Sequence, residues 1–216
     1  GWRTSAARGP MPRVLHTSTR IDMPADEYWA LRMDQGFDAF SAERDASTFE
    51  LIERRNEEQD GKVVEFMQCL LLYKENPVPS SLQHMMGALP AVAWTCPHPQ
   101  SRPTSAPPGA AQFGFKYSVR WYRDHYDEAH ACTFTSEPPV FRDRISVSGR
   151  TWLVPAGPTS CDVWYREEIS VKVFGVGSVA EQVIEKRMRE SLGKLNDISL
   201  QYTKTEDYQR FVAARK

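Results

Sequence analysis

Tyr165 and Glu167, two side chains of an alternating segment near the carboxyl end of the chain, could bind or act on a ligand. They lie two residues apart in the stretch Ser160 to Phe174, so a β-strand would point both to the same face. In an apolar pocket, a phenol or a carboxyl group can hydrogen-bond a ligand hydroxyl or carbonyl. An unpaired buried carboxylate is costly, which favours the alternative that Glu167 lies near solvent beside an arginine.

No other pattern indicates catalysis, and we predict no catalytic residue and no cofactor. Glu168 follows Glu167 directly, so on a strand the two acids point to opposite faces and cannot work as an acid–base pair. The chain also lacks Gly-x-Ser-x-Gly, the phosphate-binding loop and Gly-x-Gly-x-x-Gly. Catalysis therefore ranks below binding as an interpretation of this sequence.

The segment 123–130, Arg-Asp-His-Tyr-Asp-Glu-Ala-His, suggests a metal site because it holds several possible ligands. These are Asp124, His125, Asp127, Glu128 and His130. Their spacing matches no established ligand pattern, and His-Glu-x-x-His is absent. A run of charges between two strands is usually a solvated turn, so we predict a turn and no metal site.

The elements around these residues predict a fold rich in strands. Arg13–Met23 alternates like a strand, and two short helices follow, one from Pro24 and one over Gly36–Asp45. The further predicted strands are Ser47–Asn56, Lys62–Glu75, Ala91–Cys96, Gln112–Tyr122, Ala129–Ser136, Ile145–Val154 and Ser160–Phe174. A hairpin turn at Asp60–Gly61, a short helix over Pro77–Leu89 and a Pro/Ser-rich loop over 97–109 complete the predicted order.

A long amphipathic helix closes the domain. Ser178 can cap it, and Glu181 three residues later would complete a capping box. Gly175 and Gly177 allow a sharp corner between the last strand and this helix. One helix face is apolar and the other is charged, so the helix should lie on an apolar surface along one side only.

This order predicts a curved antiparallel sheet around the last helix, with a cavity where the two do not meet. Ligand contacts should then come from alternate strand residues and from the apolar helix stripe. The candidates are Phe66, Leu70, Phe134, Trp152, Val154, Val163, Tyr165, Glu167, Ile169, Val171, Val183, Met188 and Leu192. On the long strand, the opposite face with Met67, Cys69 and Leu71 is an alternative, and simple core filling is the alternative for every apolar residue.

Two motifs resemble those of START-like helix-grip proteins of the SRPBCC superfamily. Gly149-Arg-Thr-Trp-Leu-Val-Pro155 is similar to a Gly-x-x-x-Val-x-Pro strand, with Leu153 in place of the valine. Ile169, Ser170, Val171, Val173, Gly175, Gly177 and Glu181 match a strand-to-helix motif, with Phe174 and Val176 inserted. The pattern is closest to the VASt/Aster-type group and to bacterial START-like proteins of unknown function. The resemblance implies an α+β helix-grip fold, with two short helices after the first strand, and a cavity for an apolar ligand.

Composition places few limits on function. The 216 residues carry a formal net charge of −1, which gives no general attraction to nucleic acid or to anionic membranes. No apolar run is long enough to span a bilayer, so we expect at most transient membrane contact. The four cysteines are spread along the chain without a Cys-x-x-Cys pair, which favours reduced thiols and an intracellular protein.

Residues 1–12 read as a basic arm or a transit-peptide remnant, 13–203 as the START-like domain and 204–216 as a tail. The first twenty residues contain arginines and no acid, as in mitochondrial or plastid transit peptides. The favoured function is binding or transfer of a lipid, sterol or quinone-like molecule. The alternative is a non-catalytic subunit of a larger, possibly organellar assembly with a protein partner.

Overall fold

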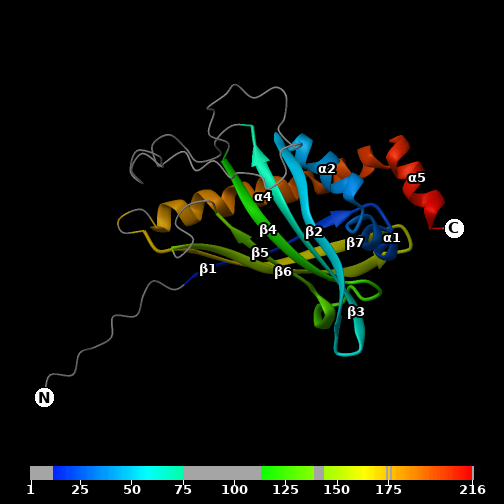
Figure 1. Cartoon of the computed structure of the whole chain (residues 1–216), viewed down its shortest axis with the longest axis horizontal. Helices are drawn as coiled ribbons and strands as arrows, with labels where there is room; N and C mark the ends of the chain where they lie inside the picture. The colour runs from blue at the N-terminus through cyan, green and yellow to red at the C-terminus, as the bar shows by residue number, and fades with distance from the viewer. Residues whose placement is uncertain (1–11, 75–112, 139–143, 174, 176, 216) are drawn as a thin grey trace, which may run out of the picture.

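The computed structural model describes residues 12–74, 113–138, 144–173, 175 and 177–215. Its centre is one antiparallel sheet of seven strands in the order β1-β7-β6-β5-β4-β3-β2 (Figure 1). The strands are β1 (Arg13–Ile21), β2 (Ser47–Gln59), β3 (Lys62–Tyr73), β4 (Phe113–Tyr122), β5 (Cys132–Glu137), β6 (Ile145–Gly157) and β7 (Ser160–Val171). The predicted helix 77–89, strand 91–96 and loop 97–109 lie outside the described residues.

The helices are α1 (Ala25–Leu31), α2 (Gln35–Arg44), a 3-10 turn η1 (Glu128–His130), α4 (Gly177–Tyr202) and α5 (Glu206–Ala214). Two short helices after the first strand and a long helix after the last confirm the predicted α+β order. The Asp60–Gly61 hairpin is also confirmed, and both residues have positive φ angles, 52° and 70°. Among the described residues, no helix is both long and apolar enough to cross a membrane.

The corner between β7 and α4 depends on Gly177. A Cβ atom there would lie 2.3 Å from the carbonyl oxygen of Val171. The Gly177 amide donates to the Val173 carbonyl at 2.9 Å. The predicted capping box is wrong. α4 begins at Gly177, so Ser178 lies inside the helix, and the Glu181 carboxylate accepts from the backbone amide of Val171 at 2.9 Å, which ties α4 to the end of the strand.

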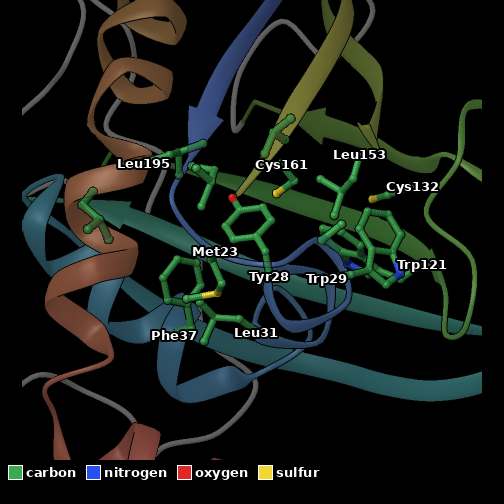
Figure 2. Packing of buried hydrophobic residues seen from close by; sticks show 14 of the residues in the cluster. Met23, Tyr28, Trp29, Leu31, Phe37, Trp121, Cys132, Leu153, Cys161 and Leu195 are labelled. Atoms are coloured by element: carbon green, nitrogen blue, oxygen red, sulfur yellow. The ribbon is translucent and has the colours of Figure 1, made fainter. Parts of the chain in front are cut away.

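Two apolar clusters hold α4 against the sheet. Near its start, Ala180 packs with Ile169 and Val171 of β7. Near its end, Leu195 and Ile198 join the main core (Figure 2), which also contains side chains of α1, α2 and most strands. The helix therefore rests on β1 and β7 along one side and on α2 along the other.

Tyr202, at the end of α4, fixes the helix to the α1–α2 corner. It is fully buried, and its hydroxyl donates to Oδ2 of Asp34 at 2.5 Å. Asp34 also caps α2 by accepting from the Gly36 amide at 3.2 Å. A Cβ atom at Gly36 would lie 2.4 Å from the Tyr202 hydroxyl, so glycine makes this approach possible.

We expect Tyr202→Phe to lower the free energy of unfolding by about 2 kcal/mol, because the half-buried carboxylate of Asp34 loses a charge-assisted hydrogen bond. Denaturant unfolding measures the change. In a double-mutant cycle with Asp34→Asn, the coupling energy between the two side chains should account for most of that loss of stability. If the two single effects simply add, the hydroxyl and the carboxylate are not coupled.

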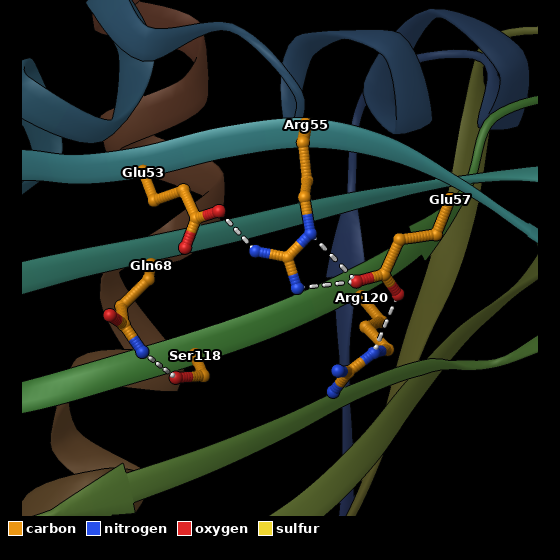
Figure 3. Close-up of polar contacts among 6 residues, drawn as sticks. All are labelled: Glu53, Arg55, Glu57, Gln68, Ser118 and Arg120. Carbon is orange, nitrogen blue, oxygen red and sulfur yellow. Dashed lines mark hydrogen bonds and ion pairs between the residues drawn. The ribbon is translucent and has the colours of Figure 1, made fainter.

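The outer face of β2, β3 and β4 is polar (Figure 3). Arg55 donates to Glu53 and Glu57, and Arg120 donates to Glu57 at 3.1 Å. The guanidinium carbons of Arg55 and Arg120 lie 4.0 and 4.8 Å from the ring centroid of Phe66. Phe66 therefore points away from α4, under a layer of charged side chains.

The segment 204–216, expected to be a tail, contains α5. Thr205 caps this helix by accepting from the Tyr208 amide at 3.2 Å. Tyr208 is buried, and its hydroxyl donates to the Glu27 carboxylate of α1. The expectation of a tail is corrected, because a capped helix with a buried tyrosine packs on the domain.

Candidate functional site

A cavity of about 440 Å³ lies between the sheet and α4. On β4, its lining extends from Trp121 to Phe115, six residues or about 20 Å of strand. On α4, it is lined by one stripe that includes Val183, Met188 and Leu192. Because the two clusters hold α4 near both of its ends, the helix and the central strands stay apart between them.

Arg32 is the cationic side chain at the α1 end of the cavity. Its guanidinium carbon lies 5.3 Å from the ring centroid of Phe37 and 5.6 Å from that of Trp121. Its ion pair with Asp38 is long, 3.8 Å between Nη1 and Oδ1. Burial raises the pKa of Asp38 to about 6, although the charge of Arg32 acts in the opposite direction.

Glu167 is a buried carboxyl group on β7, next to the edge strand β1. It is 3% exposed, and burial raises its pKa to about 7. Its Oε2 has no hydrogen-bond partner in the described part of the chain, so the expected arginine partner is wrong. Gly149 of β6 pairs with Glu167, and a Cβ atom there would lie 2.9 Å from Cγ of Glu167. Glycine at this position therefore makes room for the glutamate side chain on the cavity side.

Tyr165 and Tyr28 bring two phenol groups to the same cavity. Thr151 of β6 pairs with Tyr165 of β7, so both point inward from neighbouring strands. Burial raises the pKa of both tyrosines above the ordinary value, so the two phenols stay protonated at neutral pH. Together with Arg32 and Asp38, they make a polar region in a cavity that is otherwise mostly apolar.

Eight of the predicted ligand-binding residues line this cavity. They are Phe134, Val163, Tyr165, Glu167, Val171, Val183, Met188 and Leu192. On β3, the alternative face is the one that lines it, through Met67, Cys69 and Leu71. That these side chains contact a ligand stays a prediction.

The other five predicted residues lie elsewhere. Phe66 and Leu70 are on the outer face of β3, and Ile169 fills the small cluster under the start of α4. Trp152 points outward and stacks on Trp164, with ring centroids 6.3 Å apart, and Val154 is 43% exposed. The inward residues of β6 are Thr151 and Leu153, because register with β7 places them beside Tyr165 and Val163.

Five residues that line the cavity were not predicted from the sequence: Tyr28, Arg32, Asp38, Trp121 and Thr151. One signal was present for Arg32. Arg32 follows Tyr28 by four residues, so the two share a face of α1, and a charge on the buried face of a short helix is unusual.

Three residues of the 123–130 segment come together at the turn before β5. Possible ligand atoms of His125, Asp127 and His130 lie within 4.8 Å of one another. Both ring nitrogens of His130 already have neighbours: Nδ1 lies 3.0 Å from the Asp127 carboxylate, and Nε2 contacts the Lys62 ammonium. A cation at Nε2 disfavours a metal ion beside this ring.

The cysteines of the described part of the chain, Cys69, Cys132 and Cys161, are free and buried. Burial raises the pKa of Cys69 to about 12 and that of Cys161 to about 11, so neither is a reactive thiolate at neutral pH. They act as small apolar side chains, and Cys69 and Cys132 help to line the cavity.

Comparison with known proteins gives structural likeness only, since no family model and no curated protein matches the chain. The protein TTHA0849 from Thermus thermophilus is 12% identical, with a TM-score of 0.51 over 94% of this chain and 100% of that one. A START superfamily protein from Mycobacterium smegmatis is 15% identical, with a TM-score of 0.50 over 88% and 99%. Dicamba monooxygenase bound to dicamba is 17% identical, with a TM-score of 0.50 over 95% and 52%.

The order of the strands, the two helices after β1 and the long helix across the sheet agree with these likenesses. The chain therefore has the helix-grip fold, which it shares with the START superfamily protein.

Proposed function

We propose that this protein binds a hydrophobic small molecule in the cavity between the sheet and α4. The observation that carries the proposal is the cavity itself: its volume of about 440 Å³ is that of a small-molecule site, and apolar side chains provide most of its lining. The START superfamily likeness supports ligand binding in general. Lipids, sterols and quinone-like molecules are the ligands that the proposal includes.

Native mass spectrometry of the purified protein tests this proposal. An intact mass above that of the chain, with the excess released on unfolding, would identify a bound ligand. A protein that carries no small molecule and binds none of a panel of lipids, sterols and quinones would contradict it. Co-migration of the protein with a larger assembly would then favour the alternative function, that of a non-catalytic subunit of such an assembly.

A cavity-filling variant connects the ligand to this cavity. Val183 lines it from α4, and tryptophan at this position adds bulk toward the sheet. We expect Val183→Trp to lose the bound ligand or to weaken its binding by more than about tenfold, because indole occupies volume that the ligand needs.

The matched control for this variant is Val179→Trp. Val179 lies one turn earlier on the same helix and is 47% exposed, so the same change there should leave ligand binding unaltered. Titration of both variants with a ligand identified by mass spectrometry makes the comparison. Equal binding by the two variants would place the ligand outside the cavity.

A further inference from the structure

The outer face of the sheet, turned away from α4, carries basic side chains in one row across neighbouring strands. Register places Arg150 of β6 directly opposite Arg166 of β7, and Arg166 directly opposite His16 of β1. The same row continues through Thr133 of β5 to Arg120 of β4, and all five side chains are exposed. Directly opposite residues have Cβ atoms about 5 Å apart, so Arg150, Arg166 and His16 lie side by side. We call these three residues the basic row.

Neither arginine of the basic row has a carboxylate partner among the described residues. Arg150 donates to the backbone carbonyl oxygen of Glu128 at 2.6 Å, which is a neutral acceptor. The side chain of Arg166 forms no hydrogen bond or ion pair with any other described residue. Like charges directly opposite on neighbouring strands destabilise a sheet. The two arginines therefore lower the stability of the free protein, and an anion that binds both would relieve their repulsion.

The two acidic residues that β7 adds to this face lie outside the basic row. Asp162 accepts two hydrogen bonds from Arg20, at 2.5 and 3.1 Å, so its charge already has a partner. Glu168 lies one row away, where the register sets it opposite Ser148 and Val14. The basic row is therefore open to an anion from outside the chain.

Two tryptophans lie beside the basic row. Trp152 and Trp164 are directly opposite on β6 and β7, and their stacked rings have centroids 6.3 Å apart. The His16 ring lies 5.3 Å from that of Trp164. Tryptophan and arginine are over-represented among the residues that dominate the binding energy of protein interfaces. The composition of this patch is thus typical of a surface that binds another protein.

The packing of the tryptophans favours a protein over other polyanions. Nucleic-acid bases stack on open ring faces, but Trp152 is only 7% exposed, so its ring offers little surface to a base. Membrane docking requires apolar side chains that reach into the lipid, whereas these two rings lie against each other on the sheet. Carboxylates of aspartate and glutamate bind arginine through two parallel hydrogen bonds and need neither feature.

We propose that the basic row is a docking site for an acidic segment of a protein partner. Aspartate or glutamate side chains of that segment bind Arg150 and Arg166, and a neighbouring side chain packs on the exposed part of Trp164. The site lies on the opposite face of the sheet from the cavity, so it does not depend on the proposed ligand binding.

Fluorescence anisotropy of the whole chain with a labelled peptide of about ten glutamates, which is longer than the row when extended, tests the proposal. Binding at low salt should weaken as salt is added. Arg150→Gln and Arg166→Gln should each weaken it at least about fivefold, because each removes a charge-assisted pair. Both variants should unfold at the same temperature as the parent protein or higher, since a repulsion is removed. A lower unfolding temperature with unchanged peptide affinity would show a structural role only and overturn the proposal.

Arg189→Gln is the matched control. Arg189 is exposed on α4, on the other side of the sheet, and it already donates to Glu185 at 2.9 Å. The substitution removes the same charge from the chain, so it should leave peptide affinity unchanged. Equal losses of affinity in all three variants would show that net charge alone drives binding and would overturn the proposal.

Two further probes distinguish the classes of polyanion. They are oligothymidylate of matched length and phosphatidylcholine vesicles that contain phosphatidylserine. If either binds more tightly than the peptide and loses that binding in Arg166→Gln, the basic row recognises nucleic acid or an anionic membrane, and the assignment to an acidic protein is overturned. Failure of the peptide to bind at low salt would overturn it as well.

Discussion

Glu167→Gln is expected to stabilise the protein above pH 7, by up to about 3 kcal/mol. Burial raises the pKa of Glu167 from 4.5 to about 7. Above that pH the carboxylate is charged, and its buried surroundings disfavour the charge. Between those two pH values, the folded protein keeps a proton that the unfolded chain has released. Stability therefore declines as the pH rises through this window, and glutamine removes that decline.

Denaturant unfolding at about pH 5 and about pH 8 measures this difference. The variant and the parent protein should be nearly equally stable at the lower pH and should separate at the higher one. Burial raises the pKa of Asp38 to about 6, which gives a decline of the same sign at lower pH, but that contribution is present in both proteins. The quantity that tests the prediction is therefore the difference in unfolding free energy between Glu167→Gln and the parent protein at each pH.

Glu168→Gln is the control for charge. Glu168 lies on the opposite, exposed face of β7, so its replacement should leave the pH dependence unchanged. Parallel stability curves for Glu167→Gln and the parent protein would show that the carboxylate has a favourable partner when it is charged.

The sequence predicted β7 and α4 well because each has one polar and one apolar face. On β7, inward Tyr165 and Glu167 alternate with outward Arg166 and Glu168, and the structure confirms that alternation. On α4, the apolar stripe repeats at helical spacing, so the residues that face the sheet could be chosen before the fold was known. Where the two faces differ in polarity, alternation is enough to identify the inward set.

On β3 and β6, the same reasoning could not choose a face. Phe66 and Leu70 alternate with Met67 and Leu71, so both faces of β3 are apolar. On β6, outward Trp152 is more hydrophobic than inward Thr151, and only the register with β7 identifies the inward side. Register is a long-range property, and shifting it by one residue exchanges the faces of a strand.

The polar residues of α1 and α2 were missed for a related reason. Arg32 directly follows α1 and Asp38 lies in the first turn of α2, and charges in and beside short helices usually face solvent. They line the cavity because α1 and α2 close one end of the fold, and the spacing of Tyr28 and Arg32 is the one local signal of that position.

Gly177→Ala is expected to destabilise the protein by about 2–4 kcal/mol. The added Cβ would lie 2.3 Å from the carbonyl oxygen of Val171, and backbone atoms cannot rotate away as a side chain can. Relief requires the first turn of α4 to move. That movement strains the Gly177–Val173 hydrogen bond and the bond from the Val171 amide to Glu181, which together join the helix to β7.

Gly193→Ala is the matched control on the same helix. A Cβ at Gly193 meets no atom within 4 Å, so alanine there should raise stability by about 0.5–1 kcal/mol through its better helix propensity. Denaturant unfolding of the two variants should therefore give changes of opposite sign. Since Ala180, Val183 and Ile184 line the cavity from the first turns of α4, Gly177→Ala should also weaken ligand binding, whereas Gly193→Ala should not. A Gly177→Ala protein with full stability and full affinity would show that the corner can relax without moving the helix.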